Sequence, residues 1–435
     1  MASIKNLFLL FVLLFAQTTW ASPDIQYWQL KNGVRVYFVE THDLPIVQMG
    51  VVFDAGSARD PKGKGGLSAM VAGMLNEGAE KLNADDIAKA FEDQGAEFGA
   101  GSDRDMMTIS LRSLSDESYL KPVTELFPKL LKAPTFPQDS FEREQNRLVV
   151  ALRQQTADPG DVAERLFFRN LYGDHPYATD SAGEAETVKS ITRDDLVSFH
   201  KQFFVGANAI LVLVGDLEKG DARKLSRALV GGLPRGKKPE ALPEPKSVAS
   251  ESVIVKDFPS SQSHIHIGQL GMKRQDPDYF PLYVGNYILG GGGLVSRFAD
   301  EIREKRGLAY SVYSYFWPLR QSGPFLIGMQ TRNDQREKAL ALLKKNLSDF
   351  VEKGPDKKEL EAAKKHLTGG FPLRIDSNKK ITNYLMVIGF YDLPLTYLDE
   401  FIGRIESVTL EQIRDAYKRR VHPDKLVTVV VGGKP

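Results

Sequence analysis

The sequence contains no cysteine among its 435 residues. This absence excludes disulfide bonds, thiolate nucleophiles and cysteine-ligated zinc sites. Net charge is also nearly absent, because 57 lysine and arginine residues offset 56 acidic residues to leave +1. We therefore expect no nucleic-acid partner, since binding to phosphates needs a concentrated basic face. With 42% hydrophobic and 26% charged residues, the composition is typical of a soluble globular protein, and the length predicts two domains.

The most apolar stretch of the chain lies at its amino terminus. Lys5 precedes an apolar run from Leu7 to Ala16, and the small residue Ala21 follows before a polar segment. This order is typical of a secretory signal peptide, and the run is shorter than the roughly 20 residues that span a bilayer. We predict that residues 1–21 are a signal peptide and that the mature protein has no stable membrane span. A retained anchor is the alternative. We expect the protein in the periplasm of a Gram-negative bacterium.

Two segments far apart in the chain repeat one pattern. Residues 191–217 and 408–434 align without a gap, and each reads as an amphipathic helix followed by a buried strand that ends in Val-Gly. Thr192 and Thr409 stand where a side-chain oxygen can cap the helix. The repetition predicts two copies of one structural unit.

The boundary between the two copies is visible in the composition. Residues 231–251 are rich in proline, glycine, lysine and glutamate and lack an apolar period, which predicts an extended linker. We expect an amino-terminal half at 22–230 and a carboxy-terminal half at 252–435. Strands and helices are mixed without strict alternation, so we predict an α+β fold. Each half should be a sandwich of an antiparallel sheet with helices on one face.

Both halves contain sequence segments that resemble one protein family. The first is VVFDAGSARDPKGKGGLSAMVAGMLNEGAEK, and the second is YILGGGGLVSRFADEIREKRGLAYSVYS. They resemble the pitrilysin/insulinase family of zinc peptidases, which includes the mitochondrial processing peptidases. The resemblance covers essentially the whole mature chain and includes its duplication. It implies a fold of two homologous halves that face each other across a substrate chamber.

The resemblance also shows which residues are missing. Active members carry an inverted zinc motif, His-x-x-Glu-His, on the helix that follows the first glycine-rich turn. Its histidines fall on Ala69 and Gly73, its glutamate falls on Ala72, and the distant carboxylate ligand falls on Val150 or the adjacent Ala151. None of these side chains can bind a metal. We therefore expect a degenerate zinc site with no metal held by this chain.

Two residues of the second half match the family instead. Arg303 and Tyr310, in REKRGLAY, have the spacing of an arginine and a tyrosine that reach the substrate carbonyl beside the zinc in active relatives. The resemblance implies that they stabilise charge on the transition-state oxygen. Without it, Arg303 would be a solvated helix residue paired with Glu301 or Glu304, and Tyr310 a packed strand aromatic.

A third feature is the segment from Gly95 to Leu111, where relatives add an extended peptide to an edge strand. The resemblance implies that Phe98, Gly99, Ala100 and Gly101 bind substrate through the backbone, a mode that needs no metal. Relatives commonly have asparagine where Gly99 stands, so a side-chain contact is lost there. A glycine-rich edge without a ligand is the alternative.

Two further patterns are weaker. His264 and His266 lie two apart on a predicted strand and share one face, but no third metal ligand accompanies them. The glycine run 290–293 is not followed by the Lys-Ser/Thr of a phosphate-binding loop. We interpret the histidines as ordinary strand residues and the glycines as a loop.

These observations lead to one leading hypothesis and two alternatives. We expect an exported, zinc-less subunit that is inactive alone and pairs with a zinc-bearing homologue. Arg303 and Tyr310 would then act in trans on an extended peptide beside the partner's zinc. A metal-free peptide-binding or chaperone-like scaffold is the first alternative, and an autonomous metalloendopeptidase with an unrecognised site is the second.

Overall fold

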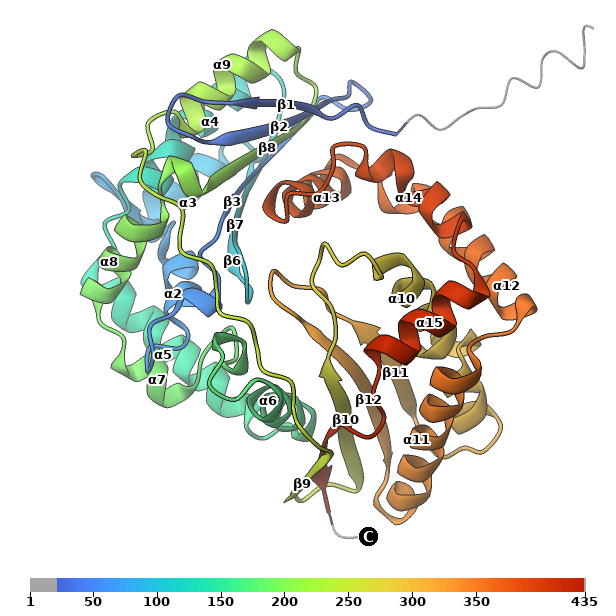
Figure 1. The fold of residues 1–435 in the computed structure, drawn as a ribbon. Coiled ribbons are helices and arrows are strands. Elements are labelled where there is room, and N and C mark those ends of the chain that lie inside the picture. Colours follow the sequence, from blue (N-terminus) through green and yellow to red (C-terminus); the bar gives the residue numbers. More distant parts are fainter. Residues whose placement is uncertain (1–21, 434–435) are drawn as a thin grey trace, which may run out of the picture.

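A computed structural model describes residues 22–433, so the predicted signal peptide lies outside the described residues. Two β-sheets, one in each half of the chain, form the framework (Figure 1). The first sheet contains, in spatial order, β1 (Gln26–Gln29), β2 (Arg35–Glu40), β8 (Ala209–Gly215), β3 (Ile46–Phe53), β7 (Met107–Leu114) and β6 (Glu97–Ser102). The second contains β9 (Ser252–Asp257), β13 (Val427–Gly432), β10 (Gln262–Leu270), β12 (Pro324–Arg332) and β11 (Ser311–Phe316). A small hairpin joins β4 (Gly78–Ala79) to β5 (Leu82–Asn83).

The two sheets have the same topology. In each, one parallel pair is followed by three antiparallel neighbours, so that β2, β8, β3, β7 and β6 correspond to β9, β13, β10, β12 and β11. Strand β1 is an addition that pairs antiparallel with β2. The predicted duplication is therefore confirmed at the level of strand order.

Helices accompany the strands in both halves, with more of them in the first half than in the second. The amino-terminal half has α2 (Leu67–Met74), α3 (Ala84–Glu92), α4 (Glu117–Lys132), α5 (Gln138–Gln155), α6 (Pro159–Tyr172), α7 (Ala185–Ser190), α8 (Arg193–Phe203) and α9 (Lys219–Val230). The carboxy-terminal half has α10 (Tyr279–Asn286), α11 (Arg336–Lys353), α12 (Lys357–Gly369), α13 (Asn378–Phe390), α14 (Tyr397–Glu406) and α15 (Leu410–Arg420). The predicted caps are present, because Thr192 accepts the Asp195 N–H at the start of α8 and Thr409 accepts the Gln412 N–H at the start of α15.

The halves exchange helices across their interface. Helix α6 of the first half packs on β10 and β13, and α13 of the second half packs on β8 and β3. The predicted α+β sandwich is confirmed, and the exchange adds a helix to the second face of each sheet. The apolar side chains of the strands alternate between the two faces, so one set contacts its own helices and the other contacts the exchanged helix. The two halves are thus interlocked.

A buried carboxylate lies where the halves meet. Asp105 is 1% exposed and accepts hydrogen bonds from the hydroxyl of Tyr177, from the hydroxyl of Tyr391 at 2.9 Å and from the backbone N–H of Arg320 at 2.7 Å. Burial raises its pKa, although these three donors act in the opposite direction. Two of the donors belong to the second half, so this polar network fastens one half to the other.

The segment 231–251 contains no helix or strand, and it is held along its length. The Gly206 N–H donates to the Pro234 carbonyl at 2.6 Å, and the Gln321 side chain donates to the Leu242 carbonyl at 2.6 Å. The segment therefore contacts both halves rather than standing away from them. Within the described residues, the helices are all too short or too polar to cross a membrane.

Candidate functional site: a degenerate zinc helix, an edge strand and an exposed Arg–Tyr pair

Helix α2 is held firmly at its amino end. It follows Gly66, which has a left-handed backbone (φ 94°) that glycine adopts without strain. The carboxylate of Asp60 accepts the N–H groups of Gly66 and Ser68, each at 2.8 Å, and so takes the place of a side-chain cap. Burial raises the pKa of Asp60 to about 7. The position of this helix is therefore set by a buried contact that sequence reasoning missed.

The four degenerate positions lie on α2 and α5, which pack against each other. Ala69 is half-buried, Ala72 is 2% exposed, Gly73 is exposed and Val150 is 53% exposed. A Cβ added at Gly73 would meet no heavy atom within 4 Å, so there is open space beside this helix. The surface is accessible, but it offers no nitrogen, oxygen or sulfur from a side chain.

Neighbouring polar groups do not substitute for the missing ligands. Glu77 is paired with Arg143, and Glu144 is paired with Arg143 and Arg147, so both carboxylates already have cationic partners. The Ser68 hydroxyl is buried without a partner, but a lone hydroxyl is not among the usual zinc ligands. The residues present therefore do not fit a catalytic zinc ion at this helix, and no chemical step of this chain can be assigned to one.

Strand β6 lies at the open edge of its sheet and pairs only with β7. Phe98 anchors it by stacking on Phe91, with ring centroids 5.4 Å apart. A Cβ at Gly99 would meet only the Ser110 hydroxyl, and one at Gly101 would meet nothing within 4 Å. Ala100, between them, is half-buried. Helix α2 packs beside the strand, so an extended chain added to this edge would lie next to the degenerate helix.

Arg303 and Tyr310 come together in the second half. Arg303 lies in the π-helical turn Ala299–Glu304, and its Cζ is 6.0 Å from the centroid of the Tyr310 ring. Tyr310 is 74% exposed, which does not fit the alternative of a packed strand aromatic. The Nε of Arg303 is 3.4 Å from Glu304, as the solvated-helix alternative predicts. Within residues 22–433 the Tyr310 hydroxyl has no hydrogen-bond partner, so both polar heads are available to a ligand.

The two weaker patterns have structural explanations. Gly290 lies in the π-helical turn Tyr287–Gly291, so the prediction of a loop was wrong here. A Cβ at Gly290 would lie 2.7 Å from the backbone nitrogen of Ser314, so this glycine lets the turn approach β11 closely. His264 lies 3.3 Å from the Gln330 amide, and His266 is buried against Phe167 of α6. Burial lowers the pKa of His266 to about 4. In the described part of the chain, neither histidine joins a group of three metal-binding side chains.

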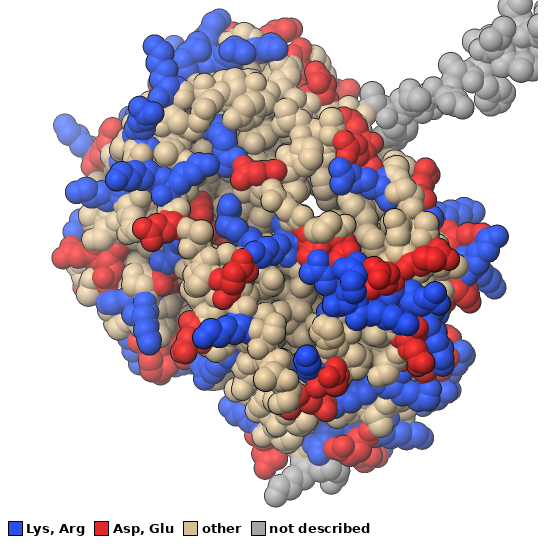
Figure 2. Space-filling view, viewed as in Figure 1, with Lys and Arg blue, Asp and Glu red and all other residues tan. Residues whose placement is uncertain are grey.

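The charge distribution agrees with the sequence analysis. On the face seen in Figure 2, lysine and arginine alternate with aspartate and glutamate over both halves, without a continuous basic stripe. A concentrated basic surface is what a nucleic-acid ligand needs.

Comparison with family models gives two matches along the chain. Residues 35–183 match the model described as insulinase (peptidase family M16), and residues 190–367 match the model described as the peptidase M16 inactive domain. The two matches together span most of both halves.

Individual relatives agree with these matches. The chain is 30% identical over 406 residues to a non-peptidase homolog of Helicobacter pylori, with 92% of each chain covered. It is 22% identical over 410 residues to an uncharacterized zinc protease of Bacillus subtilis, with 93% of this chain and 98% of the relative covered. A crystal structure described as the peptidase M16 inactive domain from Pseudomonas fluorescens is 38% identical, covers 94% of this chain and 98% of its own, and superposes with a TM-score of 0.91. The names of the relatives differ, and the side chains at positions 69, 72, 73 and 150 here agree with the non-peptidase description.

Proposed function

This chain belongs to the insulinase (M16) family of peptidases as a member without the catalytic zinc site on α2. From that premise we propose that it is the subunit of a two-chain peptidase that lacks the catalytic zinc. The observation that carries the proposal is a contrast within one molecule. Helix α2 keeps its contact with Asp60 and its packing but has no metal-binding side chain at positions 69, 72 and 73, whereas Arg303 lies beside the exposed Tyr310 ring, with its Cζ 6.0 Å from the ring centroid. A chain that had lost peptidase chemistry altogether would have no need of that exposed pair.

Each conserved part has a distinct task in this proposal. The backbone of β6 holds an extended peptide by strand addition, with room for a second chain at Gly99 and Gly101. The guanidinium of Arg303 and the hydroxyl of Tyr310 donate hydrogen bonds to the carbonyl oxygen as negative charge develops on it. Zinc, bound in a homologous partner subunit, supplies the activated water. This chain itself positions the peptide and stabilises charge.

The location of the complex is part of the proposal. The amino-terminal pattern of Lys5, the apolar run from Leu7 to Ala16 and Ala21 supports export, and a periplasmic enzyme of this class would act on unfolded or extended peptides. The partner should be exported by the same route.

The test is a co-purified complex of this chain with a zinc-bearing homologue, assayed on an unstructured peptide. We expect activity from the pair and none from this chain alone. Arg303→Ala and Tyr310→Phe should each lower kcat by about 10²- to 10³-fold, as the loss of one oxyanion donor does. Arg306→Ala is the matched control, because Arg306 lies three residues on and is bound by Glu301. An unchanged rate for both Arg303→Ala and Tyr310→Phe would refute the proposal.

A second candidate, a metal-free peptide-binding scaffold, is favoured by one observation. The open edge of β6 needs no zinc to pair with a peptide. If this were the whole function, the chain alone would bind extended peptides, and Ala100→Pro would abolish binding by removing a backbone donor. Arg303→Ala would then leave peptide binding and the activity of any complex unchanged.

A further inference from the structure

The ends of two parallel strands bring chemically reactive side chains together, far from α2 in the fold. In the register of β2 and β8, Glu40 lies opposite Gly215, and the Thr41 N–H donates to the Gly215 carbonyl at 3.1 Å. Parallel strands leave a sheet at the same edge. The residues after β2 and the residues after β8 therefore meet there, although more than 170 positions separate His42 from Asp216 along the chain.

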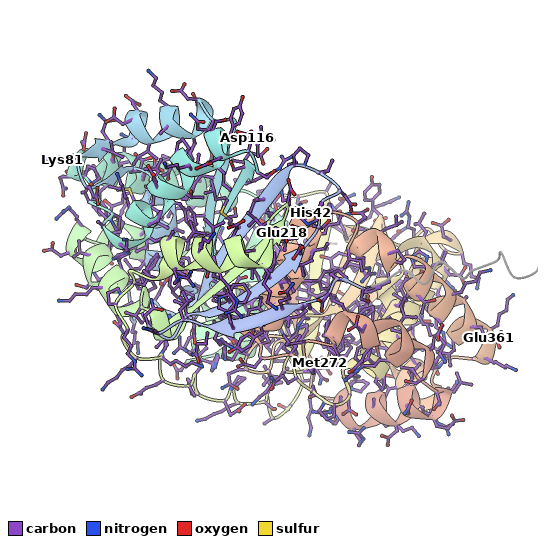
Figure 3. The ribbon with its side chains drawn as sticks, turned by 90° about the horizontal axis from the view of Figure 1, so that it is seen from above. His42, Lys81, Asp116, Glu218, Met272 and Glu361 are labelled. Atoms are coloured by element: carbon purple, nitrogen blue, oxygen red, sulfur yellow. The ribbon has the colours of Figure 1, made fainter. Side chains whose placement is uncertain are left out.

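Three of these exposed side chains bring atoms that could bind a metal close together. Ligand atoms of Glu40, His42 and Glu218 all lie within 4.8 Å of one another, which is the one such group in the described part of the chain. The Nε2 of His42 is 3.2 Å from Glu40. Figure 3 shows His42 and Glu218 next to each other, between the end of β2 and the start of α9.

A fourth residue orients the imidazole. The Nδ1 of His42 is 2.6 Å from Asp216, whose other oxygen accepts a hydrogen bond from the Ser115 hydroxyl at 2.5 Å. The Asp216 N–H in turn donates to the Ile46 carbonyl at 3.1 Å. A histidine that binds metal through one nitrogen usually donates the other N–H to a carboxylate in this way. The imidazole is thus held with Nε2 directed at Glu40.

Among the described residues, the ion-pair partner of Glu40 and of Asp216 is His42, and only when its imidazole is protonated. Glu40, Asp216 and Glu218 contribute three carboxylates, and within residues 22–433 no lysine or arginine forms an ion pair with any of them. Glu218 has neither an ion-pair nor a side-chain hydrogen-bond partner there. A divalent cation would neutralise most of this charge.

The second half of the chain serves as an internal reference for this cluster. There, Asp257 lies opposite Gly432, and the Phe258 N–H donates to the Gly432 carbonyl at 3.0 Å, so the backbone is arranged as in the first half. The positions that match His42 and Asp216 are occupied by Pro259 and Gly433. The strand ends therefore fold in the same way without these ligands, and packing does not explain the cluster.

We propose that Glu40, His42 and Glu218 bind one divalent transition-metal ion of the zinc class, with Asp216 orienting His42. One imidazole nitrogen and two carboxylates suit such an ion, and water would complete its coordination at this exposed position. The ion would connect the end of β2 to the start of α9. The site shares no residue with the degenerate helix or with the Arg303–Tyr310 pair.

The test uses the full chain without any partner, so its outcome is independent of the proposed peptidase function. Zinc chloride is titrated calorimetrically into the metal-free protein, and thermal unfolding is followed with and without zinc. We expect one saturable ion per chain and a zinc-dependent rise in Tm, both lost in His42→Ala and in Glu218→Gln. Asp216→Asn should weaken binding by about 10- to 100-fold.

His264→Ala is the matched control, since it removes a histidine from the strand pair and should leave zinc binding unchanged. Absence of saturable zinc binding to the unmodified chain would overturn the proposal. Binding that persists in His42→Ala but is lost in His264→Ala would overturn it as well, because the ion would then lie on β10.

Discussion

The two halves of this molecule share one backbone plan and differ in what they place on it. Both have the same strand order, and a threonine caps α8 in the first half and α15 in the second. In both, one helix packs on the sheet of the opposite half. Their free edges differ. The edge of β6 is open at Gly101, whereas at the corresponding edge strand β11 the Asn286 amide donates to the Ser314 carbonyl at 3.0 Å and the π-helical turn at Gly290 packs against the strand. Of these two corresponding edges, that of β6 is the one open to strand addition.

This contrast shows how a fold can persist after its catalytic side chains have been lost. The shared features are packing features, and their loss would cost stability in either half. The features that differ are single polar side chains at positions with space around them, such as 69, 73 and 150 in the first half and 303 and 310 in the second. Substitution of such residues leaves the core intact. The family fold therefore persists even when one half loses its catalytic side chains and the other keeps them.

The largest expected effect follows from restoring what the first half lacks. In a His42→Ala background, Ala69→His, Gly73→His and Val150→Glu together should create stoichiometric zinc binding, because the α2 surface is accessible and α5 packs beside it. Calorimetric zinc titration measures this gain, and the same variant with Val150→Leu is the control that lacks the carboxylate.

The same experiment separates binding from catalysis. Hydrolysis also needs a glutamate at position 72, where the alanine is only 2% exposed, so Ala72→Glu should cost stability through overpacking. Failure of the three-ligand variant to bind zinc would mean that the geometry of the helix pair, and not only its donor atoms, has been lost.

The sequence predicted the parts of the molecule that depend on local pattern and duplication. The repeated helix and strand at 191–217 and 408–434 led to two halves of one fold, and the glycine and alanine residues on α2 led to a degenerate site. The missed features all depend on which distant segments become neighbours. The strand within 191–217 was recognisable, but its parallel pairing with β2 was not, so the contact of His42 with Asp216 was not predicted. The contact of Asp105 with Tyr391 depends on the helix exchange, which no local signal reveals.

The second prediction concerns the contact between the halves. Asp105→Ala leaves two buried hydroxyls and one buried N–H without an acceptor, so it should lower the free energy of unfolding by about 3 kcal/mol. Asp392→Asn is the matched control, because Asp392 has a left-handed backbone (φ 53°) that asparagine tolerates. Asp392 also joins the halves, through Arg35, but its side chain is 54% exposed, and such pairs contribute less than about 1 kcal/mol.

Urea denaturation measures both changes, and limited proteolysis of residues 231–251 reports separation of the halves. The Asp105 network joins the halves as inferred only if Asp105→Ala is clearly more destabilising and more sensitive to protease than Asp392→Asn. Equal effects of the two variants would place the main inter-half contact elsewhere.

The smallest expected effect concerns a position where the corresponding strands β3 and β10 carry different residues. In their registers, Gly50 of β3 lies opposite Val212 and His266 of β10 lies opposite Val429, so the two residues correspond. Gly50 lies under Met386 of the exchanged helix α13, and His266 contacts Phe167 of the exchanged helix α6. One interface therefore contains a titratable group that the other lacks.

Burial lowers the pKa of His266 to about 4, with the nearby His264 acting in the same direction, whereas an unfolded histidine titrates near 6.5. Between these values the unfolded chain binds more protons than the folded one, so stability falls as the pH falls from 6.5 toward 4. At pH 5 this loss is about 2 kcal/mol relative to neutral pH. His266→Phe keeps the aromatic contact with Phe167 and removes the proton, so its stability should fall less between pH 7.5 and pH 5 in urea denaturation. His264→Phe, at the half-buried position of the same strand, should change the slope less. An identical slope for the unmodified chain and His266→Phe would show that the acid sensitivity does not come from His266.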